Sequence, residues 1–347
     1  MDLPFHSFRP DTDQLLNILR RKKAERPVLF EFIIDPGICR LVAPQFGDPE
    51  PGSFDFFRMI MEAFRNLGYD AAPVYAWETD TLNFEKGSYN SMESRSQNQG
   101  ALITDRSSFE RYRWPDPGKG NYEVYDRLAR ELPDGMKLLA CSNGGILENA
   151  TDIVGFENLC ILALTDPDLT GEIFHHVGSR LLEYYTIVAP FEGVGACMVN
   201  DDWGFKTQTM FPPEMMQEYV FPYTRKIVSV IHDCGKPAIL HSCGNLKGIM
   251  EVVIEDLSPD GKHSFEDEIY PVEEAYEWWH DRIAIMGGID MDFLCRSTPE
   301  QVYGRALELL EKTFDRGGFA LGSGNSIARF TPLENYLAML RAAADFS

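Results

Sequence analysis

Short runs of branched and aromatic residues recur along the chain, and each is followed by a longer stretch with the apolar spacing of a helix. These runs occupy residues 28–34, 70–77, 137–142, 195–201, 237–243, 261–266, 283–289 and 319–324. Eight strand-then-helix units are typical of a closed parallel barrel. We therefore predict an α/β fold of the (β/α)8 TIM-barrel type, with an open doubly wound sheet as the alternative.

Two Thr-Pro motifs mark where late helices are expected to begin. Thr298-Pro299-Glu300-Gln301 and Thr331-Pro332-Leu333-Glu334 each place threonine at the N-cap, proline in the first turn, and Gln or Glu three residues after the threonine. The first 25 residues carry an amphipathic helix pattern, formed by Leu15, Leu16, Ile18 and Leu19. We expect one domain, residues 1–347, with an N-terminal helix within about 1–25 that closes the barrel floor.

The connection at residues 78–121 is long, polar and rich in Ser, Asn, Gly and Pro. Loops of this length in a compact domain are usually functional or disordered. Because this one follows the second strand at the carboxyl-terminal mouth of the barrel, we predict a lid-like loop. A mobile surface excursion is the alternative.

The charge balance excludes several classes of partner. The net charge of −22, from 54 acidic and 32 basic residues, would repel the phosphate backbone of nucleic acid and an anionic membrane surface. No apolar run approaches the length of a spanning helix, and the first residues do not resemble an export signal. Seven scattered cysteines do not form a disulfide framework. We expect a cytoplasmic enzyme without nucleic-acid or membrane partners.

Polar side chains gather at the expected carboxyl ends of the strands, where barrel enzymes build their active sites. Glu31, Asp35, Asn200 and Asp202 are expected to line one pocket with His241. The substrate-binding candidates are Glu31, Tyr75, Trp77, Asn200, Trp203 and Asn325, and the candidates for proton transfer are Asp201, Asp202 and His263. Packing is the alternative role for the aromatic residues.

The sharpest feature is His241-Ser242-Cys243-Gly244 at the end of the fifth expected strand. Side chains two positions apart on a strand point the same way, so the imidazole and the thiol converge. Zinc accepts this mixture of ligands, and a catalytic zinc keeps three protein ligands and one open position. The alternative is a packed cysteine beside a hydrogen-bonded histidine.

From about residue 165 onward, the chain resembles the uroporphyrinogen decarboxylase superfamily through NDDWGF at 200–205, HSCGN at 241–245, KHSFED at 262–267 and GSGNSI at 322–327. HSCGN is similar to the corrinoid-dependent methyltransferase branch. The resemblance implies a uroporphyrinogen decarboxylase-like barrel in which His241 and Cys243 bind zinc. It also implies a corrinoid (cobalamin) supplied by a separate corrinoid-carrying protein, and a small-molecule methyl donor or acceptor.

The third zinc ligand of those methyltransferases is a cysteine after the last strand, where this chain has Ser323. Serine is a poor zinc ligand. Cobalamin-independent methionine synthase, on a related barrel, takes a carboxylate ligand from a comparable position, so Glu266 is the first candidate and His263 the second. The metal set is therefore His241, Cys243 and Glu266.

The resemblance implies a methyltransferase, and the harder ligand set favours a methoxylated substrate over a thiol. The alternative is a metal-independent decarboxylase that uses Asp201 or Asp202 to protonate a carbanion. True uroporphyrinogen decarboxylases carry an arginine-rich segment after the first strand, whereas residues 31–37 here are EFIIDPG. A barrel that only binds a partner is the non-enzymatic alternative, and the glycines at 287–288 and 322–324 leave a phosphate-binding enzyme open.

Overall fold

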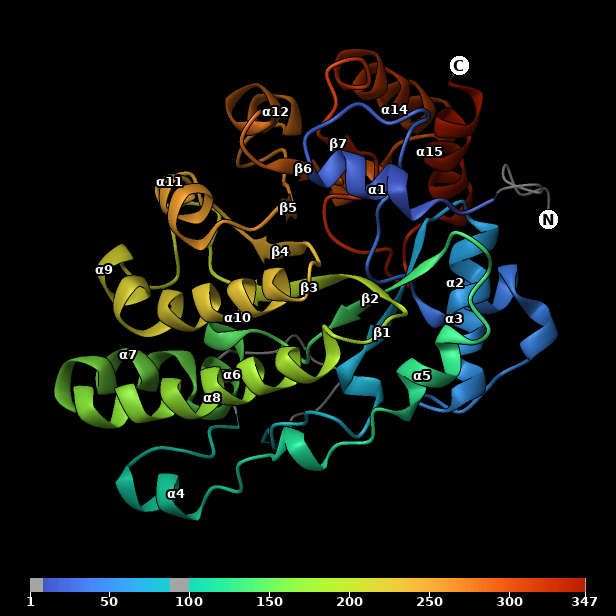
Figure 1. The fold of residues 1–347 in the computed structure, drawn as a ribbon. Helices are drawn as coiled ribbons and strands as arrows, with labels where there is room; N and C mark the ends of the chain where they lie inside the picture. The colour runs from blue at the N-terminus through green and yellow to red at the C-terminus, as the bar shows by residue number, and fades with distance from the viewer. Residues whose placement is uncertain (1–8, 88–99, 347) are drawn as a thin grey trace.

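The computed structural model describes residues 9–87 and 100–346 and shows a parallel α/β fold (Figure 1). Seven strands form one sheet in chain order, each parallel to its neighbours. They are β1 (Ala71–Tyr75), β2 (Lys137–Cys141), β3 (Val194–Asp202), β4 (Ala238–Cys243), β5 (Gly261–His263), β6 (Ala284–Met286) and β7 (Phe319–Ala320). Each lies within or overlaps a run predicted to be a strand, so the parallel α/β class is confirmed.

The first predicted strand, residues 28–34, is only partly confirmed. This extended segment joins the β7 side through isolated parallel bridges, Leu29 with Leu321 and Ile34 with Ile327. On its other side, the Phe32 carbonyl accepts a hydrogen bond from the Tyr75 hydroxyl at 2.8 Å. Within the described residues no strand ladder joins this segment to β1. A fully closed eight-stranded barrel is therefore not observed.

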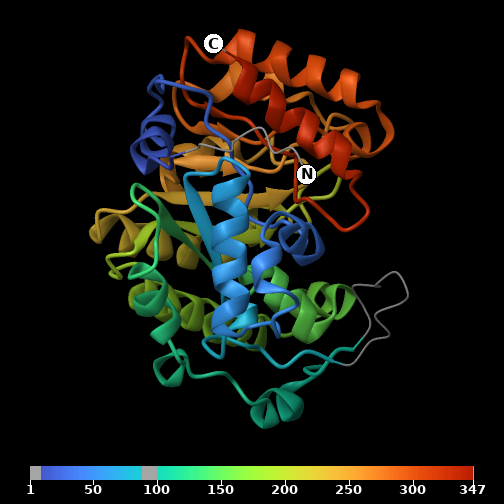
Figure 2. The ribbon, with the colours of Figure 1, turned by 90° about the vertical axis from the view of Figure 1, so that its right-hand side faces the viewer.

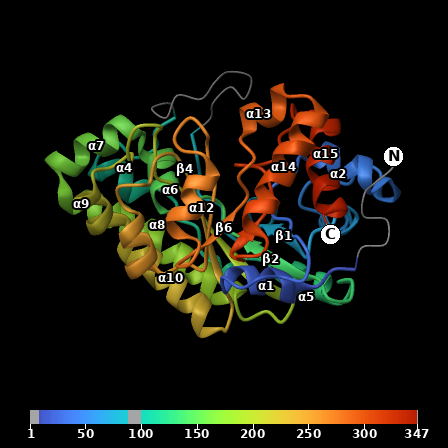
Figure 3. The same cartoon turned by 90° about the horizontal axis from the view of Figure 1, so that it is seen from above.

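Helices surround the sheet, as the view from above shows (Figure 3). In Figure 1, α8 and α10 lie on the opposite side of the sheet from α14 and α15. The helices are α1 (Thr12–Leu19), α2 (Pro36–Val42), α3 (Phe54–Asn66), α4 (Arg106–Arg111), α5 (Glu123–Ala129), α6 (Ile146–Val154), α7 (Phe156–Thr165), α8 (Pro167–Val188), α9 (Pro213–Met215), α10 (Phe221–Asp233), α11 (Met250–Val252), α12 (Val272–Trp279), α13 (Met291–Arg296), α14 (Pro299–Thr313) and α15 (Leu333–Asp345). Short 3-10 turns cover Pro44–Phe46, Ala76–Glu78 and Pro117–Lys119, and π turns cover Met216–Val220 and Val253–Leu257. None of the helices within these described ranges is long and apolar enough to cross a membrane.

One of the two predicted threonine caps is confirmed. Thr298 and Gln301 form a reciprocal capping box, in which the Thr298 backbone donates to the Gln301 side chain at 2.8 Å. The Thr331 prediction is wrong. α15 begins one residue later than expected, with Pro332 at the cap position, and the buried Thr331 hydroxyl has no hydrogen-bond partner among the described residues.

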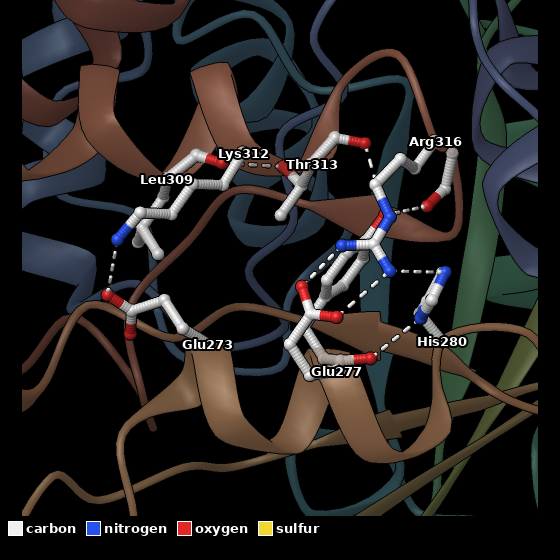
Figure 4. A network of polar contacts seen from close by, with 9 residues as sticks. Glu273, Glu277, His280, Leu309, Lys312, Thr313 and Arg316 are labelled. Atoms are coloured by element: carbon white, nitrogen blue, oxygen red, sulfur yellow. Dashed lines mark hydrogen bonds and ion pairs between the residues drawn. The ribbon is translucent and has the colours of Figure 1, made fainter.

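A polar network fastens α12 to the end of α14 (Figure 4). Arg316 pairs with Glu277, and its guanidinium lies 3.1 Å from the His280 imidazole. Lys312 lies 3.5 Å from Glu273 at the other end of the contact. Each exposed pair contributes less than about 1 kcal/mol. The network therefore links α12 to the end of α14 and contributes little to stability.

The N-terminal helix and the long loop are both present in part. α1 buries Leu15, Ile18 and Leu19, while the first eight residues of the chain lie outside the described range. The loop contains α4, which Figures 1 and 2 place at the edge of the molecule, away from α14 and α15. Leu102 donates to the Ile153 carbonyl of α6 at 2.7 Å. Residues 88–99 of the loop also lie outside the described range, and its lid function stays a prediction.

Candidate active site

The imidazole of His241 and the thiol of Cys243 converge at the carboxyl end of β4. Their Nε2 and Sγ atoms lie 3.7 Å apart, as expected for positions i and i+2 of a strand. Two ligands of one tetrahedral zinc, at about 2.0 Å for nitrogen and about 2.3 Å for sulfur, would be separated by about 3.6 Å. This pair therefore has the spacing and the chemistry of two zinc ligands.

His263 lies beside His241 on the neighbouring strand β5, in direct register with it. The two Nδ1 atoms are 2.8 Å apart, and Phe30 and Phe32 pack their rings around the histidine pair. Burial, followed by the charge of Lys262, lowers the pKa of His241 to about 3. Burial also holds the pKa of His263 well below its usual range. Both imidazoles are therefore neutral near pH 7, as metal binding requires.

Two donors contact the sulfur of Cys243. The Asn325 amide donates to it at 3.1 Å and the Ser264 hydroxyl at 3.6 Å. Burial raises the pKa of this thiol to about 11, and the charge of Asp202 adds to the rise. Without a bound cation, Cys243 is consequently a thiol and not a thiolate.

Lys262 is a site residue that the sequence reasoning missed. Its side chain is fully buried, and its ammonium donates to the carbonyls of Ser242 at 3.0 Å, His263 at 3.1 Å and Ser264. Burial lowers its pKa to about 8, although Cys243 and Glu266 oppose that change. The ammonium thus ties together the ends of β4 and β5. Strand alternation gives no signal of these contacts, because Lys262 and its neighbour His263 point to opposite faces of a strand.

The neighbouring acids Asp201 and Asp202 have different surroundings. Asp201 accepts hydrogen bonds from the backbone N–H groups of Ile146, Leu147 and Glu148 at 2.8 to 3.1 Å, so it caps α6. Asp202 is partly buried, and its Oδ1 has no hydrogen-bond partner among the described residues. Burial, then Asp201 and Glu266, raises its pKa to about 6. Of the two, Asp202 is the one with a carboxylate oxygen that no described group engages.

Glu31 and Ser323 are joined to each other and not to the His241–Cys243 pair. The buried Glu31 carboxyl accepts from the Ser323 backbone at 2.5 Å and from its hydroxyl at 2.8 Å. Burial raises the pKa of Glu31 to about 8. Asp35, also expected at the pocket, instead accepts from the Gly37 backbone at 2.8 Å and caps α2. Both acids therefore make contacts that the sequence did not predict, Glu31 with a residue far along the chain and Asp35 with its own helix.

The remaining substrate-binding candidates lie deeper than a barrel rim. Trp203 is fully buried and packs its ring against Phe221. Tyr75 is buried and stacks on Trp77, with ring centroids 4.4 Å apart. Asn200 lies beside His241 in register, and its amide is 3.0 Å from the Ser142 hydroxyl. Their substrate roles stay predictions, and the observed contacts of Trp203 and Tyr75 are those of packing.

A cleft of about 970 Å³ has Glu266 and Asn325 among its lining residues, whereas His241 and Cys243 do not line it. Asn325 connects the two, because its amide also contacts the Cys243 sulfur. A Glu266 oxygen lies 3.4 Å from the Gly244 backbone N–H, next to Cys243. Within residues 9–87 and 100–346, no three His, Cys, Asp or Glu side chains are arranged to hold a metal ion. The structure therefore provides two of the predicted ligands together and does not bring Glu266 to them.

The comparisons with known proteins agree with this architecture. Residues 94–346 match the uroporphyrinogen decarboxylase (URO-D) family. The chain is 27% identical over 197 residues to the methylated-thiol–coenzyme M methyltransferase of Methanosarcina mazei, a match that covers 56% of this chain and 50% of that protein. It thus spans about half the length of that relative. A uroporphyrinogen decarboxylase of Methylobacillus flagellatus is 26% identical over 249 residues, with 69% of this chain and 68% of that protein covered.

A solved structure has the same fold over nearly the whole chain. The methyltransferase from Methanosarcina mazei superimposes with a TM-score of 0.72 at 18% identity, covering 98% of this chain and 99% of that one. At that identity the likeness establishes the fold alone.

Proposed function

The chain belongs to the uroporphyrinogen decarboxylase (URO-D) family, and we propose that it is a methyltransferase that moves a methyl group between a small substrate and a corrinoid carried by a separate protein. The observation that carries this proposal is the 3.7 Å approach of His241 Nε2 to Cys243 Sγ at the carboxyl end of β4. The named methyltransferase relative supports it.

The pair fits zinc as two ligands, and a bound zinc would act as a Lewis acid on the heteroatom that carries the methyl group. His241 would bind through Nε2 as a neutral imidazole. Cys243 would bind as a thiolate and would have to release its proton, so zinc affinity should rise with pH. The nearby Lys262 charge and the donors Asn325 and Ser264 each lower the pKa of this thiol and assist that release.

We assign Glu266 as the third ligand in the zinc-bound state. Its carboxylate is already next to Gly244, so a change of its side-chain rotamer is the movement required. Ser323 is a poor candidate because both its hydroxyl and its backbone N–H are engaged by Glu31. Glu266→Gln should therefore weaken zinc binding more than Ser323→Ala, which keeps the backbone of residue 323 and removes no proposed ligand.

Asp202 is our candidate for the group that donates a proton to the heteroatom once the methyl group has left. It is partly buried beside Cys243, and with a pKa of about 6 it can both hold and release a proton near neutral pH. Asp201 cannot replace it while its oxygens cap α6. His263 is a weaker candidate because its ring is fully buried against His241.

The substrate class is a methylated thiol or a methoxylated compound. The harder ligand set with Glu266 favours the ether oxygen. The relative in Methanosarcina mazei is a methylated-thiol–coenzyme M methyltransferase, which favours the thiol. Both kinds of substrate should be offered in the same assay.

A metal-independent decarboxylase is the second candidate, favoured by the free Oδ1 of Asp202 and by the decarboxylase relatives. The variant Cys243→Ser distinguishes the two functions, and Cys160→Ser on α7 is its matched control. We expect close to one zinc per wild-type chain, and loss of both zinc and methyl transfer only in Cys243→Ser. A zinc-free wild type with full activity in Cys243→Ser would overturn the proposal and favour the decarboxylase.

A further inference from the structure

The contact between His241 and His263 restricts where protons can lie. With their Nδ1 atoms 2.8 Å apart, one nitrogen must donate and the other must accept. In one arrangement, Nδ1 of His241 carries the proton and its Nε2 presents a lone pair towards Cys243. In the other, Nε2 of His241 carries the proton and cannot bind a cation.

The surroundings of His263 select between these arrangements. Its Nε2 is buried and makes no hydrogen bond of ordinary geometry within the described residues. The backbone of Ser323 faces the His263 ring and acts to raise the pKa of this histidine. Both groups border Gly287, where an added Cβ would lie 2.3 Å from the Ser323 oxygen and 3.1 Å from this nitrogen. A carbonyl oxygen can only accept, so it favours a proton on Nε2 of His263. Nδ1 of His263 is then the acceptor, and His241 must be the donor.

Two features hold the Ser323 carbonyl in place. The Glu31 carboxyl accepts from both the backbone and the hydroxyl of Ser323. On the other side, Gly287 has a φ of +85° and no side chain, which lets the carbonyl and the imidazole approach each other. These contacts give Ser323 a role at the position where a third cysteine was expected.

We propose that Glu31, Ser323 and His263 form a positioning relay that fixes His241 in the tautomer whose Nε2 lone pair faces Cys243. The consequence for metal binding rests on the proposed zinc function. Partners behind a metal-bound histidine typically contribute a factor of about 10 to 100 in metal affinity. His263 therefore acts through His241, as a positioning residue, instead of donating a proton to the substrate.

Two substitutions of His263 isolate the relay. His263→Phe keeps a ring among Phe30 and Phe32 but removes both nitrogens, whereas His263→Asn can place its amide oxygen where Nδ1 was. Zinc affinity, measured by competition with a chelator, should fall about 10- to 100-fold in His263→Phe and recover to within a few-fold in His263→Asn. Thermal denaturation of both variants checks that each one folds.

The tautomer can be observed without metal by nitrogen NMR of protein labelled in its histidine side chains, with the His241 signals assigned from their loss in His241→Gln. We expect a protonated Nδ1 and an unprotonated Nε2 in metal-free wild type. A protonated Nε2, or equal zinc affinity in wild type and both folded His263 variants, would overturn the relay. A wild type that shows the expected tautomer but binds no zinc would refute the proposed function and leave the relay standing.

Discussion

Replacing Asp201 by alanine should mainly lower stability, whereas replacing Asp202 by alanine should mainly lower activity. Asp201 accepts from the N–H groups of Ile146, Leu147 and Glu148 at the buried start of α6. Leaving a buried donor without its partner costs roughly 1–3 kcal/mol, and some of the three will find water. We therefore expect Asp201→Ala to lower the free energy of unfolding by about 3–5 kcal/mol, well above the ~1 kcal/mol of an ordinary exposed cap.

Asp202→Ala should change stability by less than about 1 kcal/mol, because the buried Oδ1 of Asp202 has no hydrogen-bond partner among the described residues. Its methyl transfer should fall by a factor of about 100 or more if the group handles the proton. Asp201→Asn, which keeps an acceptor oxygen, should lie between wild type and Asp201→Ala in stability.

Urea denaturation followed by circular dichroism measures the global effect, and hydrogen exchange of a peptide spanning α6 measures the local one. Asp201→Ala should accelerate exchange at the start of α6, whereas Asp202→Ala should not. Equal stability of the two alanine variants, with α6 equally protected in both, would refute the assignment of Asp201 as a cap.

Three further predictions concern the groups around the site. Burial raises the pKa of Glu31 from 4.5 to about 8, so the folded chain binds this proton more tightly than the unfolded chain does. The protein should therefore lose stability as the pH rises through that interval, and Glu31→Gln should lose less when its free energy of unfolding is compared at pH 5 and pH 9. Gly287→Ala should destabilise the protein by about 2 kcal/mol or more in thermal denaturation, because the new methyl group would lie 2.3 Å from the Ser323 oxygen at a φ of +85°; no loss would contradict the tight approach. Removing zinc with a chelator should abolish methyl transfer and readdition should restore it, whereas a metal-free enzyme of full activity would refute the zinc role of Cys243.

Local sequence patterns predicted much of the fold. Strand alternation and helix spacing located the seven observed strands, and the i, i+2 spacing brought His241 and Cys243 together. The run at 28–34 has the composition of a strand, yet its neighbour β1 offers the Tyr75 side chain where a ladder was expected. Whether this segment forms a ladder depends on tertiary contacts, which its apolar sequence pattern does not predict.

Two of the contacts that sequence did not reveal depend on partners far along the chain. Asp201 caps a helix that begins 55 residues earlier, and Glu31 binds Ser323 across 292 residues. Lys262 had no predicted role, and in the structure the carbonyls at the ends of β4 and β5 surround its ammonium. Residue type indicated that these groups were polar, and only the fold shows what they contact.

The most direct test of the proposed activity follows an isotopically labelled methyl group in a single turnover. Zinc-loaded protein would be mixed with free cob(I)alamin and either a labelled methylated thiol or a labelled methoxylated compound. We predict the formation of methylcobalamin, identified by its absorption spectrum and carrying the label, in equal amount to the demethylated product. Cys243→Ser should form none. No label on cobalt above the Cys243→Ser background with either class of substrate would contradict the central claim.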